Sequence, residues 1–121
     1  MAETRTDFAI QDKELDARTE VVSPSGEIDL AVARDFGTHL VRLVEAGKTR
    51  LVLDFTKVSF LDSTALGVLL SAHRRARQAG GALAIVALDD NLRRIFELTG
   101  LDGVFQVFAT RDAALLALNA R

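Results

Sequence analysis

The chain has no cysteine, no tryptophan, no tyrosine and only one proline among its 121 residues. Without cysteine there is no disulfide, no thiolate nucleophile and no sulfur-ligated metal, which fits a reducing compartment such as the cytoplasm. An excess of charge of one sign is also missing, because 15 basic and 17 acidic residues leave a formal net charge of -2. Nucleic-acid binders need a broad basic surface for counterion release, so we expect no nucleic-acid partner.

Long apolar stretches are absent as well. Glu3, Arg5 and Asp7 interrupt the apolar residues between Met1 and Ile10, which is not the pattern of a signal peptide. The longest apolar runs, such as Ala82 to Leu88, are far shorter than the roughly 20 residues of a membrane-spanning helix. We therefore expect a cytoplasmic protein that makes no contact with a membrane.

The motifs of several enzyme classes are missing too. Ser63 does not lie in a G-x-S-x-G nucleophile elbow, and the glycines form neither of the common nucleotide-binding patterns. His73 stands ten residues after Ser63 on the same expected helix. It is therefore about 15 Å away, too far to act as a base. His39 has no positional link to Ser63, and no carboxylate spacing supports a metal site. We expect no enzymatic activity, no cofactor and no metal.

The residues that are present predict one α/β domain spanning residues 1–121. Of all residues, 49% are hydrophobic, which is enough for a single buried core. Short apolar runs alternate with longer segments of helical period, a pattern typical of a mixed, mostly parallel sheet with helices packed on it. The expected strands are Phe8–Lys13, Glu20–Ser23, Arg50–Phe55, Ala82–Leu88 and Val104–Phe108. We thus expect four to five strands and about four helices.

Capping residues set the ends of the expected helices. Asp29 is a good N-cap for the first helix, the second runs from about Thr64 to Ala79, and Asp89 or Asp90 caps the third. Thr110 opens a terminal helix. Glycines that favour a left-handed stop follow the first three helices: Gly47, Gly80 and Gly100. Pro24 and Gly26 predict an irregular end to the second strand.

The segment from Val58 to Gly67 carries most of the chemistry. Asp62, Ser63 and Thr64 place a carboxylate and two hydroxyls between a buried strand and the start of a helix. A helix start offers free backbone N–H groups and the positive end of the dipole, so it accommodates an anion or a phosphoryl group. The alternative is that Asp62 or Ser63 only caps the helix.

The second helix has two distinct faces at about 100° per residue. One stripe of mostly small residues is expected to face the sheet: Ala65, Val68, Leu69, Ala72, Ala76 and Ala79. Ser63, Leu66, Leu70, His73 and Arg77 lie on a different flank. If that flank is exposed, two leucines beside a modifiable serine form a partner-binding patch. Alternatively, the leucines pack against a neighbouring helix.

Arginines gather on the same helix. Arg74, Arg75 and Arg77 form a basic cluster, and Arg93 and Arg94 are candidates to extend it. Such a cluster either meets an acidic partner surface or is an ordinary solvated helix face.

Several segments together resemble the STAS domain family, named for sulfate transporters and anti-sigma factor antagonists. They are SGEIDL at 25–30, LVLDF at 51–55, FLDSTALG at 60–67, AHRRAR at 72–77 and FELTGL at 96–101. The resemblance implies a STAS-type fold. It also implies a freestanding regulator that binds an anti-sigma factor, itself a protein serine kinase, and so frees the sigma factor for transcription.

The resemblance further implies that Ser63 is the phosphorylated residue. In the family, phosphorylation releases the antagonist and a serine phosphatase restores it. Here Ala65 stands where the family usually has glycine, and Thr64 stands where a second serine is common. We assign Asp62 to capping and kinase contact, and Thr64, Leu66 and Leu70 to docking, with Asp29 as a neighbour. We expect a monomer or weak homodimer.

Two other functions use the same fold. One is a scaffold subunit of a larger signalling or transport assembly that works without phosphorylation. The other is a small-molecule or nucleotide sensor that binds at the start of the second helix.

Overall fold

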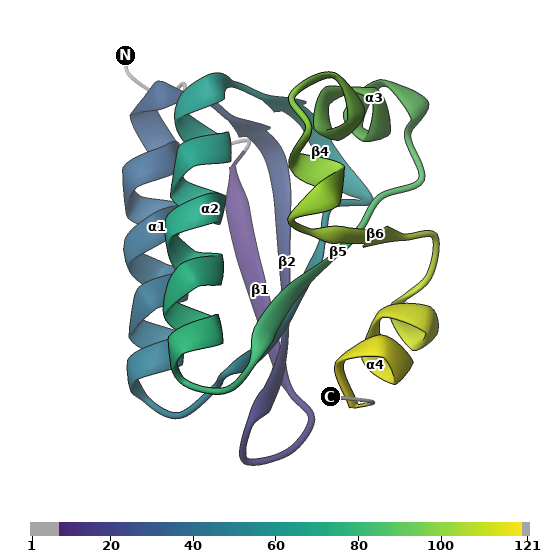
Figure 1. The fold of residues 1–121 in the computed structure, drawn as a ribbon. Helices are drawn as coiled ribbons and strands as arrows, with labels where there is room; N and C mark the ends of the chain where they lie inside the picture. Colours follow the sequence, from purple (N-terminus) through teal and green to yellow (C-terminus); the bar gives the residue numbers. More distant parts are fainter. Residues whose placement is uncertain (1–7, 120–121) are drawn as a thin grey trace.

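The computed structural model describes residues 8–119 of the chain (Figure 1). Its elements in chain order are β1 (Ala9–Glu14), β2 (Thr19–Ile28), α1 (Leu30–Glu45), β3 (Arg50–Asp54), β4 (Lys57–Leu61), α2 (Ser63–Gln78), β5 (Ala82–Val86), α3 (Asp90–Leu98), β6 (Gln106–Phe108) and α4 (Arg111–Asn119). The predicted α/β fold is confirmed. No helix of the described part is both long and apolar enough to cross a membrane.

The strands form one mixed sheet in the order β1-β2-β3-β5-β6, with β4 also paired to β2. Only β1 runs antiparallel to its neighbour, and every other pairing is parallel. The described sheet has six strands rather than the four to five expected. The additional strand is β4, which follows β3 in the same direction along β2.

The chain changes neighbours between β3 and β4. Leu53 pairs with Val22 of β2, whereas Lys57 pairs with Ser25, so the register shifts by one residue between them. At this bulge the Phe55 N–H donates to the Val86 carbonyl at 2.8 Å, which continues the pairing of β3 with β5. A bulge bends a strand without ending its pairing, which is why the polar residues after Phe55 do not end the sheet there.

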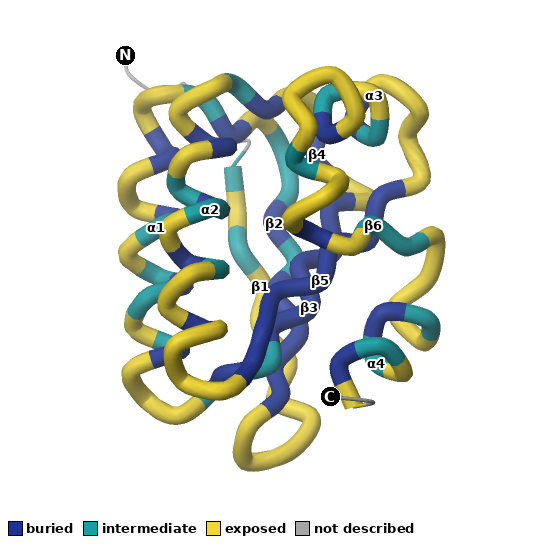
Figure 2. Tube along the Cα trace, in the orientation of Figure 1, coloured by how far each residue is buried: buried dark blue, intermediate teal, exposed yellow. Residues whose placement is uncertain are grey.

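The sheet separates two apolar layers of unequal size. The pair α1 and α2 covers one face, and α4 covers part of the other (Figure 1). The larger layer holds the bulkiest buried side chains, including Phe36, Leu40, Leu53, Phe55, Leu69, Phe96 and Phe105. The smaller layer under α4 consists of Val21, Val52, Ala82, Ala84, Val86, Ala114 and Leu118. Strands β3 and β5 are buried on both faces, as Figure 2 shows.

Local capping follows the sequence closely. Asp29 caps α1, Asp89 caps α3, and the Thr110 hydroxyl accepts a hydrogen bond from the Ala113 N–H at 3.1 Å. The three stop glycines all have positive φ, at 100°, 88° and 76° for Gly47, Gly80 and Gly100. The irregularity expected at Pro24 and Gly26 is present as a register shift after Gly26. However, β2 continues past it to Ile28.

Helices α1 and α2 approach each other closely at Gly37. A Cβ built on Gly37 would lie 2.6 Å from Val68 Cγ1, so only glycine fits this contact. Val68 therefore faces α1, and its predicted place in the stripe that faces the sheet is wrong. The neighbours Ala65, Leu69, Ala72 and Ala76 are buried as predicted, whereas Ala79, the C-cap of α2, is exposed.

Candidate functional site

At the start of α2, one residue caps the helix and the next presents an exposed hydroxyl. Asp62 has an extended backbone, and its Oδ1 accepts a hydrogen bond from the Ala65 N–H at 3.0 Å. Asp62 is therefore the N-cap, and the helix begins at Ser63 rather than Thr64. Ser63 is exposed, and its hydroxyl has no hydrogen-bond partner among residues 8–119. Of the two alternatives that the sequence left open, capping belongs to Asp62, which leaves the Ser63 oxygen free.

Asp29 is brought beside this position by strand pairing. Ile28 at the end of β2 pairs with Leu61 at the end of β4, and the Asp62 N–H donates to the Ile28 carbonyl at 3.3 Å. Asp29 caps α1 by accepting from the Ala31 N–H at 3.0 Å. The two capping aspartates thus follow paired strand ends, and α1 and α2 begin at the same edge of the sheet (Figure 1).

The leucine flank of α2 does not form an exposed patch. Leu66 is only 9% exposed and belongs to the core, and Leu70 is half-buried against it. Farther along this flank, His73 Nδ1 accepts a hydrogen bond from the Leu83 N–H at 3.3 Å, and its ring packs edge-on against Phe105. The flank is largely buried at Leu66 and His73, so Leu66 offers little surface to a partner, and its docking role stays a prediction. Thr64, next to Ser63, is exposed.

Other apolar side chains are exposed at this edge, and the sequence analysis missed them. Leu30 is 66% exposed, Phe60 47% and Leu88 61%. Leu30 and Leu88 each lie two residues after a strand, β2 and β5, and Phe60 is the penultimate residue of β4. Parallel strands carry their carboxyl ends to one edge of a sheet. The sequence does contain a signal for the exposure of two of them, because each stands next to a helix-capping aspartate: Leu30 follows Asp29 and Leu88 precedes Asp89.

Several acidic residues follow the carboxyl ends of the strands. Besides Asp29 and Asp62, the edge carries three exposed acidic residues: Glu27, Asp89 and Asp90. Two arginines of the expected basic cluster make contacts elsewhere. Arg75 Nη1 lies 3.4 Å from Glu45 Oε2, and Arg93 Nη1 donates to the Ala87 carbonyl at 3.3 Å. A phosphoryl group on Ser63 would therefore add negative charge beside the capping carboxylates of Asp62 and Asp29.

Neither histidine is placed to activate Ser63. His73 is engaged with β5, as described above, and His39 Nε2 lies 2.8 Å from Asp12 Oδ2 between α1 and β1. Within residues 8–119 there is no group of three or more histidine, cysteine or acidic side chains that could hold a metal ion.

Two buried carboxylates have shifted pKa values away from Ser63. Burial raises the pKa of Asp54, but hydrogen bonds from Arg111 and Thr56 outweigh burial and hold the pKa below its ordinary value. Asp54 and Arg111 line a small cavity of about 80 Å³ at the junction of β2, β3 and β4. Burial, reinforced by Asp12, raises the pKa of Glu20, which is 7% exposed. Both groups belong to the framework that holds the strands and α4 together.

Comparison with known proteins identifies relatives over most of the chain. The chain is 37% identical over 101 residues to an anti-sigma-B factor antagonist of Listeria monocytogenes, which covers 83% of this chain and 88% of that protein. It is 35% identical over 99 residues to the anti-sigma-F factor antagonist RsfB of Mycobacterium tuberculosis, covering 82% and 80%.

A solved structure supports the same relationship. The fold is similar to that of an anti-sigma factor antagonist from Mycobacterium paratuberculosis, with a TM-score of 0.82, 28% identity, and 98% and 99% of the two chains covered. The family model for the STAS domain matches residues 12–114. This match spans all the elements that carry Asp29, Asp62 and Ser63, and the chain therefore belongs to the STAS domain family.

Proposed function

We propose that this protein is an anti-sigma factor antagonist that binds an anti-sigma factor with serine kinase activity and is released when Ser63 is phosphorylated. Binding would free the sigma factor and so control transcription. The observation that carries the proposal is the free, exposed hydroxyl of Ser63 at the start of α2, beside a cap that uses Asp62 instead. The printed names of the relatives described above supply the partner class.

The charge of a phosphoryl group is large enough to act as the switch. It adds about -1.5 to -2 charges next to Asp62 and Asp29. At an effective dielectric of about 20, one unit charge that meets a like charge at 4 Å costs about 4 kcal/mol, which is roughly a thousandfold in affinity. The start of α2 tolerates the phosphate, because the helix dipole and its free N–H groups favour an anion. The fold therefore need not open for the switch to work.

The docking surface would surround Ser63 at the carboxyl edge of the sheet. Asp29, Asp62 and Thr64 supply polar contacts, and Leu70 contributes only its exposed part. The apolar contacts come mainly from Leu30, Phe60 and Leu88, which are far more exposed than Leu66. Apolar anchors beside a polar rim are typical of a protein–protein interface.

The protein would supply no catalytic group of its own. Neither histidine is placed to activate Ser63, so we assign transfer of the phosphoryl group to the kinase and its removal to a separate serine phosphatase.

The test is phosphorylation of purified protein by candidate anti-sigma kinases with ATP, followed by mass spectrometry. We expect phosphate on Ser63, its loss in Ser63→Ala, and retention in the matched control Thr64→Ala. Calorimetric titration with the anti-sigma factor should show that Ser63→Asp binds at least about tenfold more weakly than Ser63→Ala. Phosphate on other residues only, or equal binding of the two variants, would refute the proposal.

The scaffold alternative makes a different prediction. A scaffold subunit would form a large particle on size-exclusion chromatography with light scattering, and kinase and ATP would leave it unmodified. Under the proposal, the purified protein elutes as a monomer or weak homodimer and accepts phosphate on Ser63.

A further inference from the structure

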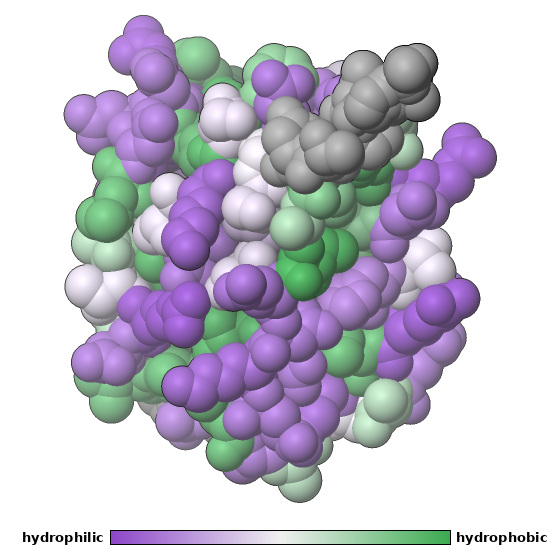
Figure 3. All heavy atoms as spheres, turned by 180° about the vertical axis from the view of Figure 1, so that it is seen from behind, coloured by the Kyte–Doolittle hydropathy of each residue, from purple (hydrophilic) through white to green (hydrophobic). Residues whose placement is uncertain are grey.

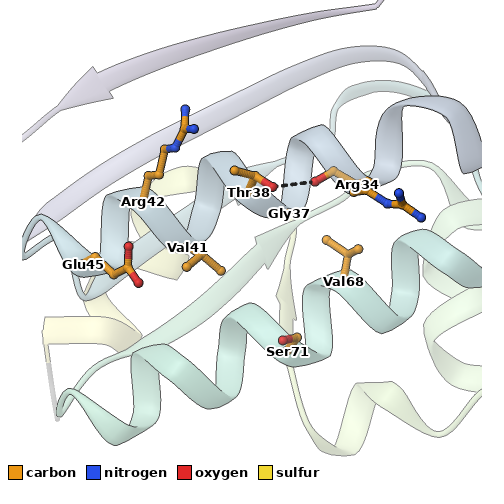
Figure 4. Close-up of a pocket in the computed structure, with 8 residues that line it drawn as sticks. All are labelled: Arg34, Gly37, Thr38, Val41, Arg42, Glu45, Val68 and Ser71. Carbon is orange, nitrogen blue, oxygen red and sulfur yellow. Dashed lines mark hydrogen bonds between the residues drawn. The ribbon is translucent and has the colours of Figure 1, made fainter.

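A groove runs along the outer face of the helix pair α1 and α2, apart from the exposed edge around Ser63. Its volume is about 370 Å³. Figure 4 shows Val41 and Val68 between the two helices, with Ser71 on the α2 side. The close contact of Gly37 with Val68 brings the helices together at one point, and the groove follows their shared surface.

The floor of the groove is apolar and accessible. Val41 and Val68 are half-buried branched side chains, and neither belongs to the fully buried core. From Arg34 to Glu45 the groove follows 12 residues of α1, whose 11 rises of 1.5 Å span about 16 Å or three helical turns. This length and the pair of parallel helical walls suit a third helix packed between the two.

The rim of the groove is basic. Arg34 and Arg42 are exposed, and the structure gives their guanidinium groups no ion pair or hydrogen bond within residues 8–119. Glu45, at the far end, is paired with Arg75 at 3.4 Å. Two uncompensated arginines therefore flank the apolar floor, and an occupant with acidic side chains complements them.

The geometry disfavours other occupants. A groove on the outer face of two helices leaves one side of its occupant in solvent, whereas small-molecule sites bury about 70–90% of a ligand. A second copy of this chain that docked through the same groove by twofold symmetry would bring the unpaired Arg34 and Arg42 of both copies into one interface, while Glu45 is already paired with Arg75. The repulsion between these like charges opposes that contact.

We propose that the α1–α2 groove binds an acidic amphipathic helix of a partner protein, with apolar side chains on Val41 and Val68 and carboxylates at Arg34 and Arg42. The groove lies on a helix face that Ser63 phosphorylation does not need, so this binding is a second contact, independent of the switch proposed above. In helix-in-groove recognition of this type, the bound helix places apolar residues at i, i+3, i+4 and i+7 in the groove.

The probe for the test is a synthetic peptide of about 15 residues, the length at which isolated helices begin to be stable in water. It carries leucine at i, i+3, i+4 and i+7 and glutamate at the flanking positions. A second peptide has lysine in place of every glutamate. Each is titrated into the ¹⁵N-labelled full chain, and amide shifts are recorded by NMR.

We expect the glutamate peptide to shift the amides of Gly37, Thr38, Val41 and Ser71, and the lysine peptide to bind at least about tenfold more weakly. Arg34→Glu with Arg42→Glu should weaken the glutamate peptide about tenfold, and Val41→Gln should weaken it to a similar degree. The matched control, Arg77→Glu with Arg94→Glu, makes the same change in net charge away from the groove and should alter binding less than about twofold.

Each contrary result overturns the proposal. Shifts centred on Leu30, Phe60 and Leu88 would assign the peptide to the edge around Ser63 instead. Equal binding of the two peptides would show that the groove does not select acidic side chains. Absence of shifts at millimolar peptide would show that the groove binds no helix of this kind. Sedimentation that shows self-association, lost in Val41→Gln, would assign the groove to a second copy. Thermal unfolding checks that every variant is folded.

Discussion

Arg111 Nε donates a hydrogen bond of 2.6 Å to Asp54 Oδ2, although the two residues are 57 positions apart in the chain. Arg111 is the first residue of α4 and Asp54 is the last residue of β3. Arg111 also donates from Nη2 to the Ser23 hydroxyl at 3.0 Å. One side chain therefore joins the start of α4 to two neighbouring strands, while Ala114 and Leu118 supply the apolar contact of α4 with the sheet.

Loss of this side chain should destabilise the protein. Asp54 is only 6% exposed, so Arg111→Gln leaves a buried carboxylate without its charged donor. We expect the free energy of unfolding in urea to fall by about 1–3 kcal/mol. The matched control is Arg94→Gln, since Arg94 is exposed and has no ion pair in the described part of the chain. The control should change stability by less than about 0.5 kcal/mol. Equal effects of the two substitutions would contradict the structural role of Arg111.

The same pair predicts a dependence on pH. The pKa of Asp54 is lowered in the folded protein, so its ionised form is favoured there. Its contribution to stability is present above the unfolded pKa of about 3.9 and is lost as the pH falls through the lower folded value. In Arg111→Gln, burial dominates and should raise this pKa. The stability gap between wild type and variant should therefore be largest near neutral pH and shrink in acid. Urea titrations at a series of pH values measure the gap, and a constant gap would count against this account.

The residues that were predicted correctly act through local geometry. Asp29, Asp62 and Asp89 cap helices by bonding to N–H groups two or three residues later, so the neighbouring sequence is enough to identify them. Gly47 and Gly100 end helices for a similarly local reason, because their positive φ is strained for other residues.

The features that were missed depend on contacts between distant segments. The β4 strand exists because Lys57–Leu61 continues along β2 after the bulge, which no pattern within these five residues reveals. Leu66 is buried because α2 packs into the larger apolar layer, whereas its helical position alone left exposure equally open. The Asp54–Arg111 pair is likewise invisible until α4 is placed on the sheet.

Glu20 should show the opposite behaviour from Asp54. Burial, followed by Asp12, raises the pKa of Glu20, although Lys48 opposes this shift with its Nζ 4.0 Å from Glu20 Oε1. A raised pKa contributes stability that is fully present below the unfolded value, about 4.3, and is lost as the pH rises through the folded value. Glu20→Gln cannot ionise, so the variant does not lose stability at this position as the pH rises. We expect the variant to gain stability relative to wild type between acidic and neutral pH.

The measurement is urea unfolding of both proteins at about pH 4 and at about pH 7. Glu14→Gln is the matched control, because Glu14 is exposed and also pairs with Lys48. A Glu20→Gln variant that is relatively less stable at neutral pH than in acid would show that the pair with Lys48 outweighs burial.

Two glycines on parallel helices should respond oppositely to alanine. A Cβ on Gly37 would lie 2.6 Å from Val68 Cγ1, so Gly37→Ala must push α1 and α2 apart and should cost about 1–3 kcal/mol. A Cβ on Gly67 would meet nothing within 4 Å. Gly67→Ala should therefore stabilise α2 by about 0.5–1 kcal/mol through helix propensity. Thermal unfolding of the two variants side by side decides the matter, and a stable Gly37→Ala would mean that the helix contact is looser than described.

At the start of α2, measurements of unfolding free energy distinguish the capping residue Asp62 from the proposed phosphorylation site Ser63. Asp62→Ala removes the acceptor of the Ala65 N–H and should cost about 1 kcal/mol, the usual value for an N-cap. Ser63→Ala removes only an exposed hydroxyl and should change stability by less than about 0.5 kcal/mol. Urea unfolding of both variants provides the comparison. If Ser63→Ala proved as destabilising as Asp62→Ala, the serine oxygen would be engaged in the helix cap, and a kinase would have to break that bond to reach it.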